Sequence, residues 1–122
     1  MQVVVVEPKK KPVVQEIGDS LEAMKKIVGG PIEAVYPFDE PVALICNEEG
    51  KLLNLPLNRA LRDDEGNVYD IIAGTFFLCA APPDSEHFES LTDQQAKTYM
   101  ECFATPEMFL NIGSSLFALP YL

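Results

Sequence analysis

Apolar runs separated by polar turns occupy the first two-thirds of the chain, and their lengths and periods predict strands. Val3 to Val6 form an unbroken β-branched run, and a second short apolar run follows the basic loop 9–12. Residues 31–38 alternate between apolar and polar positions, whereas residues 42–46 are almost continuously apolar. We predict strands at residues 3–6, 13–17, 31–38, 42–46, 68–72 and 75–80, with residues 51–55 returning after the turn at 47–50 as a hairpin partner.

An early helix is predicted between residues 19 and 29. Asp19 precedes Glu22 by three residues, which is the spacing of a capping box. An apolar helical stripe follows at Leu21, Met24, Ile27 and Val28. Gly29 and Gly30 then end the helix, because glycine readily adopts the left-handed conformation that closes a helix.

The last third of the chain predicts one or two more helices. Thr92 and Gln95 have the spacing of a second capping box, and the inward stripe follows at Ala96, Tyr99, Met100 and Phe103. Pro106 comes directly after Thr105, and proline suits the first turn of a helix, so a short helix is predicted through Met108, Phe109 and Leu110.

The order of these elements predicts an α+β fold. A chain of 122 residues with 48% apolar residues suits one domain with one core. We therefore expect a single compact domain over residues 1–122. Its first two-thirds should form a mostly antiparallel sheet, on which one early helix and one or two C-terminal helices pack.

The C-terminal residues 116–122 are almost entirely apolar. Such a segment can dock on its own chain, exchange into a dimer or remain exposed as a surface for a partner. We expect docking within the chain, so that residues 104–122 form a helical or docked tail.

Acidic side chains are concentrated in the second half of the chain. From residue 63 onward the chain contains ten acidic residues and one basic residue, Lys97, whereas residues 1–62 contain nine acidic and eight basic residues. The second half therefore carries about −9 of the net charge of −10. A surface of this sign repels phosphates and lipid headgroups and attracts basic proteins. We expect a basic protein surface or self-association, with no direct nucleic-acid contact and no membrane contact.

Three cysteines, Cys46, Cys79 and Cys102, are far apart in the sequence and lie in apolar surroundings. This pattern argues against a disulfide framework or a zinc site and favours buried thiols in a reducing compartment.

The valine run Val3 to Val6 is too short for a signal peptide or a membrane span. The expected location is the cytoplasm.

We predict no catalytic residue, no metal site and no cofactor. His87 is the single histidine, and it is interpreted as a surface residue of a polar loop. A nucleophilic cysteine paired with His87 would require one of the three thiols to meet it in space. Adjacent acids such as Asp63 and Asp64 are interpreted as solvated turns, because an acid–base pair needs two unequal environments.

Asn58, Arg59 and Arg62 lie among leucines, where a guanidinium needs a partner. An internal ion pair with a carboxylate such as Asp70 is one interpretation. The other is a ligand site in which Asn58, Arg59 and Arg62 recognise an anionic group, with Asp70 assisting.

Four stretches carry a family resemblance: VVVVEPKKKP, LEAMKKIVGGPIEAVYPF, VALICNEEGKLLNLPLNRAL and YDIIAGTFFLC. In this order they resemble a domain-of-unknown-function family of short acidic proteins encoded on phages, conjugative elements and gut-bacterial genomes. The resemblance covers about residues 1–103. It implies a compact α+β domain in a bacterial cytoplasm, often beside anti-restriction and plasmid-transfer genes, and it assigns no catalytic residue.

Two classes of function follow from these observations. The first is a non-enzymatic interaction or regulatory protein of a bacterial mobile element that presents carboxylates to a basic partner, in one version imitating nucleic acid as anti-restriction proteins do. The second is a small-molecule-binding or enzymatic domain built on Asn58, Arg59 and Arg62. An accessory domain that dimerises through a sheet edge or the apolar tail is a further alternative.

Overall fold

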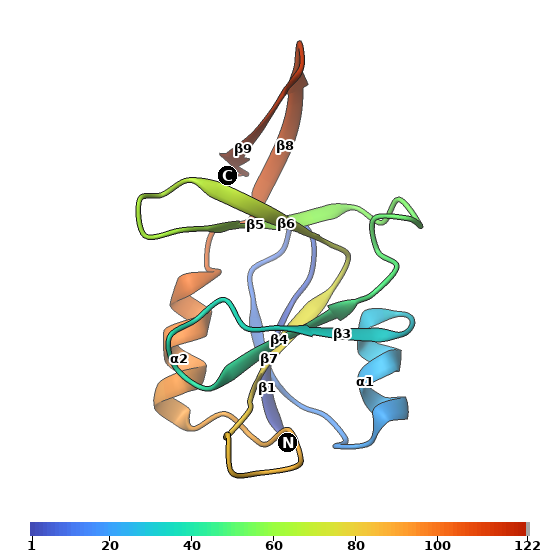
Figure 1. Ribbon diagram of the computed structural model, residues 1–122, viewed down its shortest axis with the longest axis vertical. Helices are drawn as coiled ribbons and strands as arrows, with labels where there is room; N and C mark the ends of the chain where they lie inside the picture. The colour runs from blue at the N-terminus through green and yellow to red at the C-terminus, as the bar shows by residue number, and fades with distance from the viewer. Residues whose placement is uncertain (122) are drawn as a thin grey trace.

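The computed structural model describes residues 1–121, which form nine β-strands and two α-helices (Figure 1). The elements in chain order are β1 (Gln2–Val6), β2 (Val13–Glu16), α1 (Leu21–Val28), β3 (Ile32–Val35), β4 (Val42–Asn47), β5 (Leu57–Arg62), β6 (Val68–Ala73), β7 (Phe76–Ala80), α2 (Asp93–Cys102), β8 (Glu107–Ile112) and β9 (Ser115–Pro120). The predicted α+β class is confirmed. None of the described helices is long and apolar enough to cross a membrane.

The central sheet has five strands in the order β2-β1-β7-β4-β3, and each neighbouring pair is antiparallel. Its three inner strands hold the unbroken apolar runs, and every residue of β4 and β7 is buried. Leu78 of β7 lies opposite both Val4 of β1 and Leu44 of β4, which places these runs side by side.

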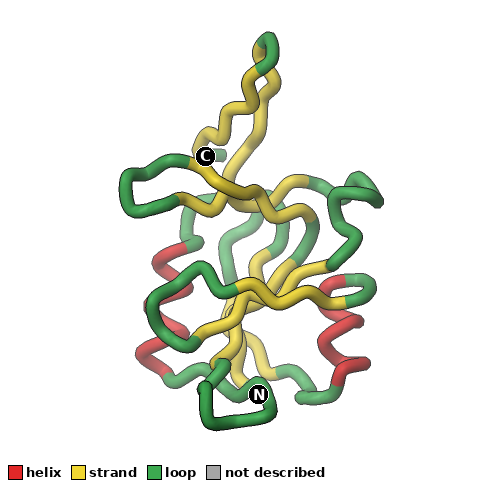
Figure 2. The backbone as a smooth tube through the Cα atoms, in the orientation of Figure 1, coloured by secondary structure: helices red, strands yellow, loops and turns green. Residues whose placement is uncertain are grey.

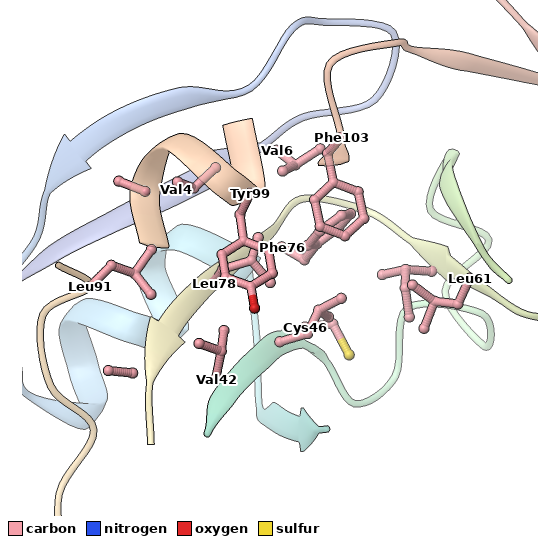
Figure 3. Packing of buried hydrophobic residues seen from close by; sticks show 14 residues of the cluster. Val4, Val6, Val42, Cys46, Leu61, Phe76, Leu78, Leu91, Tyr99 and Phe103 are labelled. Carbon is pink, nitrogen blue, oxygen red and sulfur yellow. The ribbon is translucent and has the colours of Figure 1, made fainter. Parts of the chain in front are cut away.

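The two helices lie on opposite sides of this sheet (Figure 1). Because side chains alternate across a strand, Val4, Leu44 and Leu78 face α2, while Val3, Ile45 and Phe77 face α1. Figure 3 shows the first of these layers, where Tyr99 and Phe103 of the α2 end pack against Phe76 and Leu78. Between their end residues Gln2 and Asn47, the inner strands are apolar because both of their faces are covered.

Helix α1 begins one residue later than the predicted capping box requires. Its N-cap is Ser20, whose side chain accepts a hydrogen bond from the Ala23 amide, so the predicted role of Asp19 is wrong. Serine and aspartate are both favoured as N-cap residues. The position of the inward apolar stripe therefore decides which of the two neighbouring residues begins the helix. The predicted end is confirmed: Gly29 is the C-cap, with φ of +81°, and it donates its amide to Lys25.

Helix α2 begins as predicted. The Thr92 side chain accepts from the Gln95 amide, and the Gln95 side chain accepts from the Thr92 amide, which completes the capping box. Ala96, Tyr99 and Phe103 are buried as the stripe predicts.

The hairpin partner predicted at residues 51–55 is wrong. These residues form a turn in which the Leu53 amide donates to Glu49 and the Leu55 amide donates to Gly50. Leu52 is 82% exposed, so its apolar side chain does not belong to the core. The strand is β5, Leu57–Arg62, which pairs antiparallel with β6 in a separate two-stranded sheet.

The short helix predicted after Pro106 is also wrong. Residues Glu107–Ile112 form β8, which pairs antiparallel with β9 in a two-stranded hairpin. Figures 1 and 2 show this hairpin projecting from the body of the molecule. Most of β9 is exposed, so the prediction of a helical or docked tail fails within the described residues.

Candidate functional site

Asn58 lies at the junction between the central sheet and the β5–β6 sheet and is completely buried. Its amide nitrogen donates to the carbonyls of Val6 and Gly74, each at 2.9 Å, and its Oδ1 accepts from Arg59 Nη1 at 2.9 Å. The side chain thus joins the end of β1 to the turn between β6 and β7. Gly74 in that turn has φ of +82°, and a Cβ atom there would lie 2.8 Å from Leu55 Cδ1.

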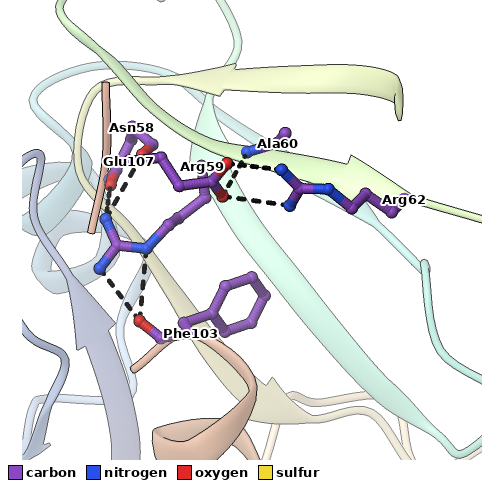
Figure 4. A network of polar contacts seen from close by, with 6 residues as sticks. All are labelled: Asn58, Arg59, Ala60, Arg62, Phe103 and Glu107. Atoms are coloured by element: carbon purple, nitrogen blue, oxygen red, sulfur yellow. Dashed lines mark hydrogen bonds and ion pairs between the residues drawn. The ribbon is translucent and has the colours of Figure 1, made fainter. Parts of the chain in front are cut away.

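Arg59 is the largest side chain that the fold buries completely, with 1% of its surface exposed. It makes five hydrogen bonds, all of them to oxygen atoms within the chain. Nε and Nη2 donate to the carbonyl of Phe103 at 3.3 and 3.0 Å, and Nη2 also donates to the carbonyl of Lys10 at 2.7 Å. Figure 4 shows the hydrogen bonds of the guanidinium to Asn58 and Phe103.

The acceptors of Arg59 explain how a buried cation is tolerated. Phe103 is the C-cap of α2, so its carbonyl carries the partial negative charge of a helix C-terminus. The last turn of α2 has no basic residue of its own, and Arg59 supplies the cation from β5. Burial lowers the pKa of Arg59, and the nearby charge of Glu107 opposes that shift.

Arg62 and Glu107 form a bidentate ion pair between β5 and the base of the hairpin (Figure 4). Arg62 Nη2 lies 2.8 Å from Glu107 Oε2, and Glu107 Oε1 also accepts from the backbone amide of Ala60 at 3.2 Å. The hydrogen bonds to Glu107 raise the pKa of Arg62. Glu107 is buried, whereas from the sequence it is counted among the carboxylates expected on the acidic surface.

Asp70 does not join this cluster. Its carboxylate pairs with Lys51 Nζ at 2.7 Å and borders a small cavity of about 120 Å³. Arg59 and Arg62 border a different cavity, of about 330 Å³. The internal ion pair anticipated for this region therefore exists with Glu107 in place of Asp70. The binding of an anionic ligand by Asn58, Arg59 and Arg62 stays a prediction. The guanidinium nitrogens of Arg59 already donate hydrogen bonds to oxygen atoms within the chain.

The thiols and the histidine are dispersed over the molecule. Cys46 and Cys79 are buried as predicted, whereas Cys102 at the end of α2 is exposed, which corrects the expectation for that residue. Burial raises the pKa of Cys46 to about 11 and that of Cys79 to about 12. His87 is exposed, and its loop is held by hydrogen bonds between Ser85 and the His87 backbone. Within residues 1–121, no three His, Cys, Asp or Glu side chains are grouped to hold a metal ion.

Eight of the ten carboxylates beyond residue 62 are exposed. They occupy the β5–β6 turn, the loop before α2 and α2 itself: Asp63, Asp64, Glu65, Asp84, Glu86, Glu89, Asp93 and Glu101. The β5–β6 turn lies at the end of the molecule from which the hairpin projects (Figure 1). Glu101 borders a cavity of about 300 Å³ together with Pro120 of the hairpin. The exposed charge therefore extends to the base of the hairpin.

The hairpin itself carries an uncharged apolar face. Met108 lies opposite Leu119 and Leu110 opposite Phe117, and Ile112 follows at the same period on β8. Alternation along each strand puts these five side chains on one face. Leu110, Ile112, Phe117 and Leu119 are 38–63% exposed. Glu107 is the single charged side chain between residues 107 and 121, and it lies on the opposite face at the buried end.

Comparison with known proteins identifies the family. The family model "Domain of unknown function (DUF3846)" matches residues 1–104, which includes both helices and the first seven strands. No match was found among curated proteins, and none among solved structures. The match stops before Glu107, so the hairpin with its apolar face lies outside the family domain. Because the match covers most of the chain, the chain belongs to this DUF3846 domain family of unknown function.

Proposed function

We propose that this chain is a non-enzymatic interaction protein that binds a basic protein partner through the apolar face of the β8–β9 hairpin. The exposure of that face carries the proposal. A two-stranded hairpin buries little apolar surface alone, and soluble proteins rarely expose large apolar side chains in a contiguous group. The five side chains Met108, Leu110, Ile112, Phe117 and Leu119 have the character of the central contact of a protein interface.

The charge of the partner is inferred from the surroundings of the hairpin. The exposed residues Asp63, Asp64 and Glu65 form the β5–β6 turn at the end of the body from which the hairpin projects, and the exposed Glu101 borders a cavity with Pro120 of the hairpin. An uncharged apolar contact bordered by carboxylates favours a surface that is apolar at its centre and basic at its rim. Long-range attraction to the net charge of −10 would increase the association rate with such a partner.

The resemblance to proteins of phages and conjugative elements extends the proposal to a regulatory protein of a bacterial mobile element. Host proteins that bind nucleic acids have basic surfaces, and an acidic chain can compete for them electrostatically, as anti-restriction proteins do. In this version the exposed carboxylates provide attraction and the hairpin provides the apolar contact.

Affinity capture from bacterial lysate followed by calorimetry with the purified partner tests the proposal. The full chain is compared with Leu110→Ser/Phe117→Ser on the hairpin and with Val13→Ser/Val14→Ser on β2, where both valines are similarly exposed. We expect a basic protein that binds the wild type and the β2 variant but not the hairpin variant. Binding should weaken between about 50 and about 300 mM salt, because salt screens exposed charges.

Two results would contradict this function. The first is a set of partners that bind the hairpin variant as tightly as the wild type. The second is a doubled mass of the chain alone in light scattering that the hairpin variant abolishes. That result would assign the apolar face to self-association.

A further inference from the structure

Another recess lies at the base of the hairpin, between three segments that are distant in the sequence. Its volume is about 590 Å³, within the range typical of small-molecule sites. Lys9 and Lys11 of the β1–β2 loop form one wall, Met100 and Ala104 at the end of α2 form the second, and Pro106 with Tyr121 forms the third.

The recess is basic, although the chain as a whole is acidic. Lys9 and Lys11 are exposed, and within residues 1–121 no carboxylate oxygen lies within 4.0 Å of either ammonium group. Lys10 between them pairs with Glu7 at 3.1 Å, so the described residues pair one of the three ammonium groups of the loop with a carboxylate. Lys9 Nζ lies 5.7 Å from the centre of the Tyr121 ring.

The walls of the recess are held in place by hydrogen bonds. Arg59 donates to the carbonyl of Lys10 and to the carbonyl of Phe103, which ties the basic loop to the end of α2. The Tyr121 amide donates to the carbonyl of Pro106 at 2.7 Å, which fixes the third wall. A site whose walls are already ordered loses little conformational entropy when it binds a ligand.

We propose that this recess binds a small organic anion with an aromatic body. The ammonium groups of Lys9 and Lys11 would bind a carboxylate, phosphate or sulfonate group by charge-assisted hydrogen bonds. The Tyr121 ring, Met100 and Pro106 provide apolar surface for a planar ring. A small anion needs only the local field of two lysines, whereas a nucleic-acid strand would extend over the carboxylates of the body.

A titration of the full ¹⁵N-labelled chain with 2-naphthoate tests this site, with the neutral 2-naphthamide as the matched ligand. We expect 2-naphthoate to shift the amide resonances of Lys9, Lys11, Thr105 and Tyr121, and 2-naphthamide to bind at least about tenfold more weakly. Lys9→Gln/Lys11→Gln should abolish the shifts. Lys26→Gln/Lys97→Gln removes the same charge at two exposed lysines elsewhere and should leave the Kd unchanged.

Three outcomes would overturn the proposal. One is an unchanged Kd in Lys9→Gln/Lys11→Gln, with circular dichroism used to confirm that this variant is folded. Another is a set of shifts confined to Leu110 and Phe117, which would place the ligand on the hairpin face. The third is an equal affinity for inorganic phosphate, which would remove the aromatic requirement. If the hairpin face proves to bind no partner, the proposal for this recess still stands, because the apolar face and the recess are formed by different residues.

Discussion

Arg59 is a buried cation whose hydrogen-bond acceptors are backbone carbonyls and the Asn58 side chain. Its position among leucines in the sequence predicts that the guanidinium requires hydrogen-bond acceptors, and the structure provides them. The partners themselves could not be predicted, because Lys10 and Phe103 are 49 and 44 residues away in the sequence. The same reason explains Arg62: proximity along the chain suggested Asp70, whereas the fold supplies Glu107.

Replacing Arg59 by lysine should destabilise the protein by about 2–4 kcal/mol. Lysine keeps the charge but has three donors on one atom, so it cannot reach the carbonyls of Lys10 and Phe103 and the side chain of Asn58 together. Urea unfolding followed by circular dichroism measures the change. Arg62→Lys is the control, and because Arg62 is partly exposed it should lower stability by about 1 kcal/mol or less. Equal effects of the two substitutions would contradict the structural role of Arg59.

The buried thiols predict a loss of stability in alkaline solution. Burial raises the pKa of Cys46 to about 11 and of Cys79 to about 12, above the ordinary value of 9.0. The folded state therefore favours the neutral thiols. Their contribution to stability is complete below pH 9.0 and is lost as the pH rises through the folded-state values. Tyr99 acts in the same direction, because burial and its hydrogen bond to Glu40 raise its pKa.

Urea unfolding at about pH 8 and about pH 10 measures this dependence. The free energy of unfolding should be lower at the higher pH, and the difference should be smaller in Cys79→Ala than in the wild type. Cys102→Ala is the control: its residue is exposed, and although burial of the thiol also raises the pKa of Cys102, its removal should change the difference less. A pH dependence that is the same in all three proteins would contradict the assignment to Cys79.

Among the elements, the β8–β9 hairpin is one of two that the sequence pattern predicts wrongly, the other being the strand expected at residues 51–55. Pro106 favours the first turn of a helix, yet Met108, Leu110 and Ile112 recur at every second position, with Glu107 and Asn111 polar and Phe109 apolar between them. This period of two was the available signal, and Gly113, with φ of +63°, marks the turn between the strands. The hairpin is held at its base by Glu107, which bonds Arg62 and the Ala60 amide.

Glu107→Ala should therefore detach the hairpin from the body. We expect a loss of about 2 kcal/mol, because the variant leaves the buried Ala60 amide without its acceptor and Arg62 without its carboxylate. Limited proteolysis should cut residues 107–121 faster than in the wild type while the remaining domain resists. Glu101→Ala makes the same change in charge at an exposed carboxylate and should leave both measurements unchanged. Equal proteolysis in the two variants would show that Glu107 does not anchor the hairpin.

The molecule as a whole combines a doubly covered sheet, an acidic exterior and an uncharged projecting hairpin. Net charge of −10 on a chain of 122 residues opposes the compact state by mutual repulsion. Salt screens this repulsion, so the urea midpoint should rise as sodium chloride increases from about 10 to about 300 mM. A midpoint that falls over this range would show that the five ion pairs of the described chain outweigh the repulsion.

The unbroken apolar runs and the helical stripes were sufficient to predict the inner strands of the sheet and both helices, because period, caps and burial depend on neighbours a few residues apart. The folded chain alone reveals that Glu107 is buried against Arg62, that Arg59 joins the basic loop to the end of α2, and that most of β9 is exposed. Each of these features depends on segments more than forty residues apart or on the absence of a covering element, and local patterns contain neither. The acidic composition predicts the sign of the surface, whereas packing places Lys9, Lys11 and Tyr121 around one recess.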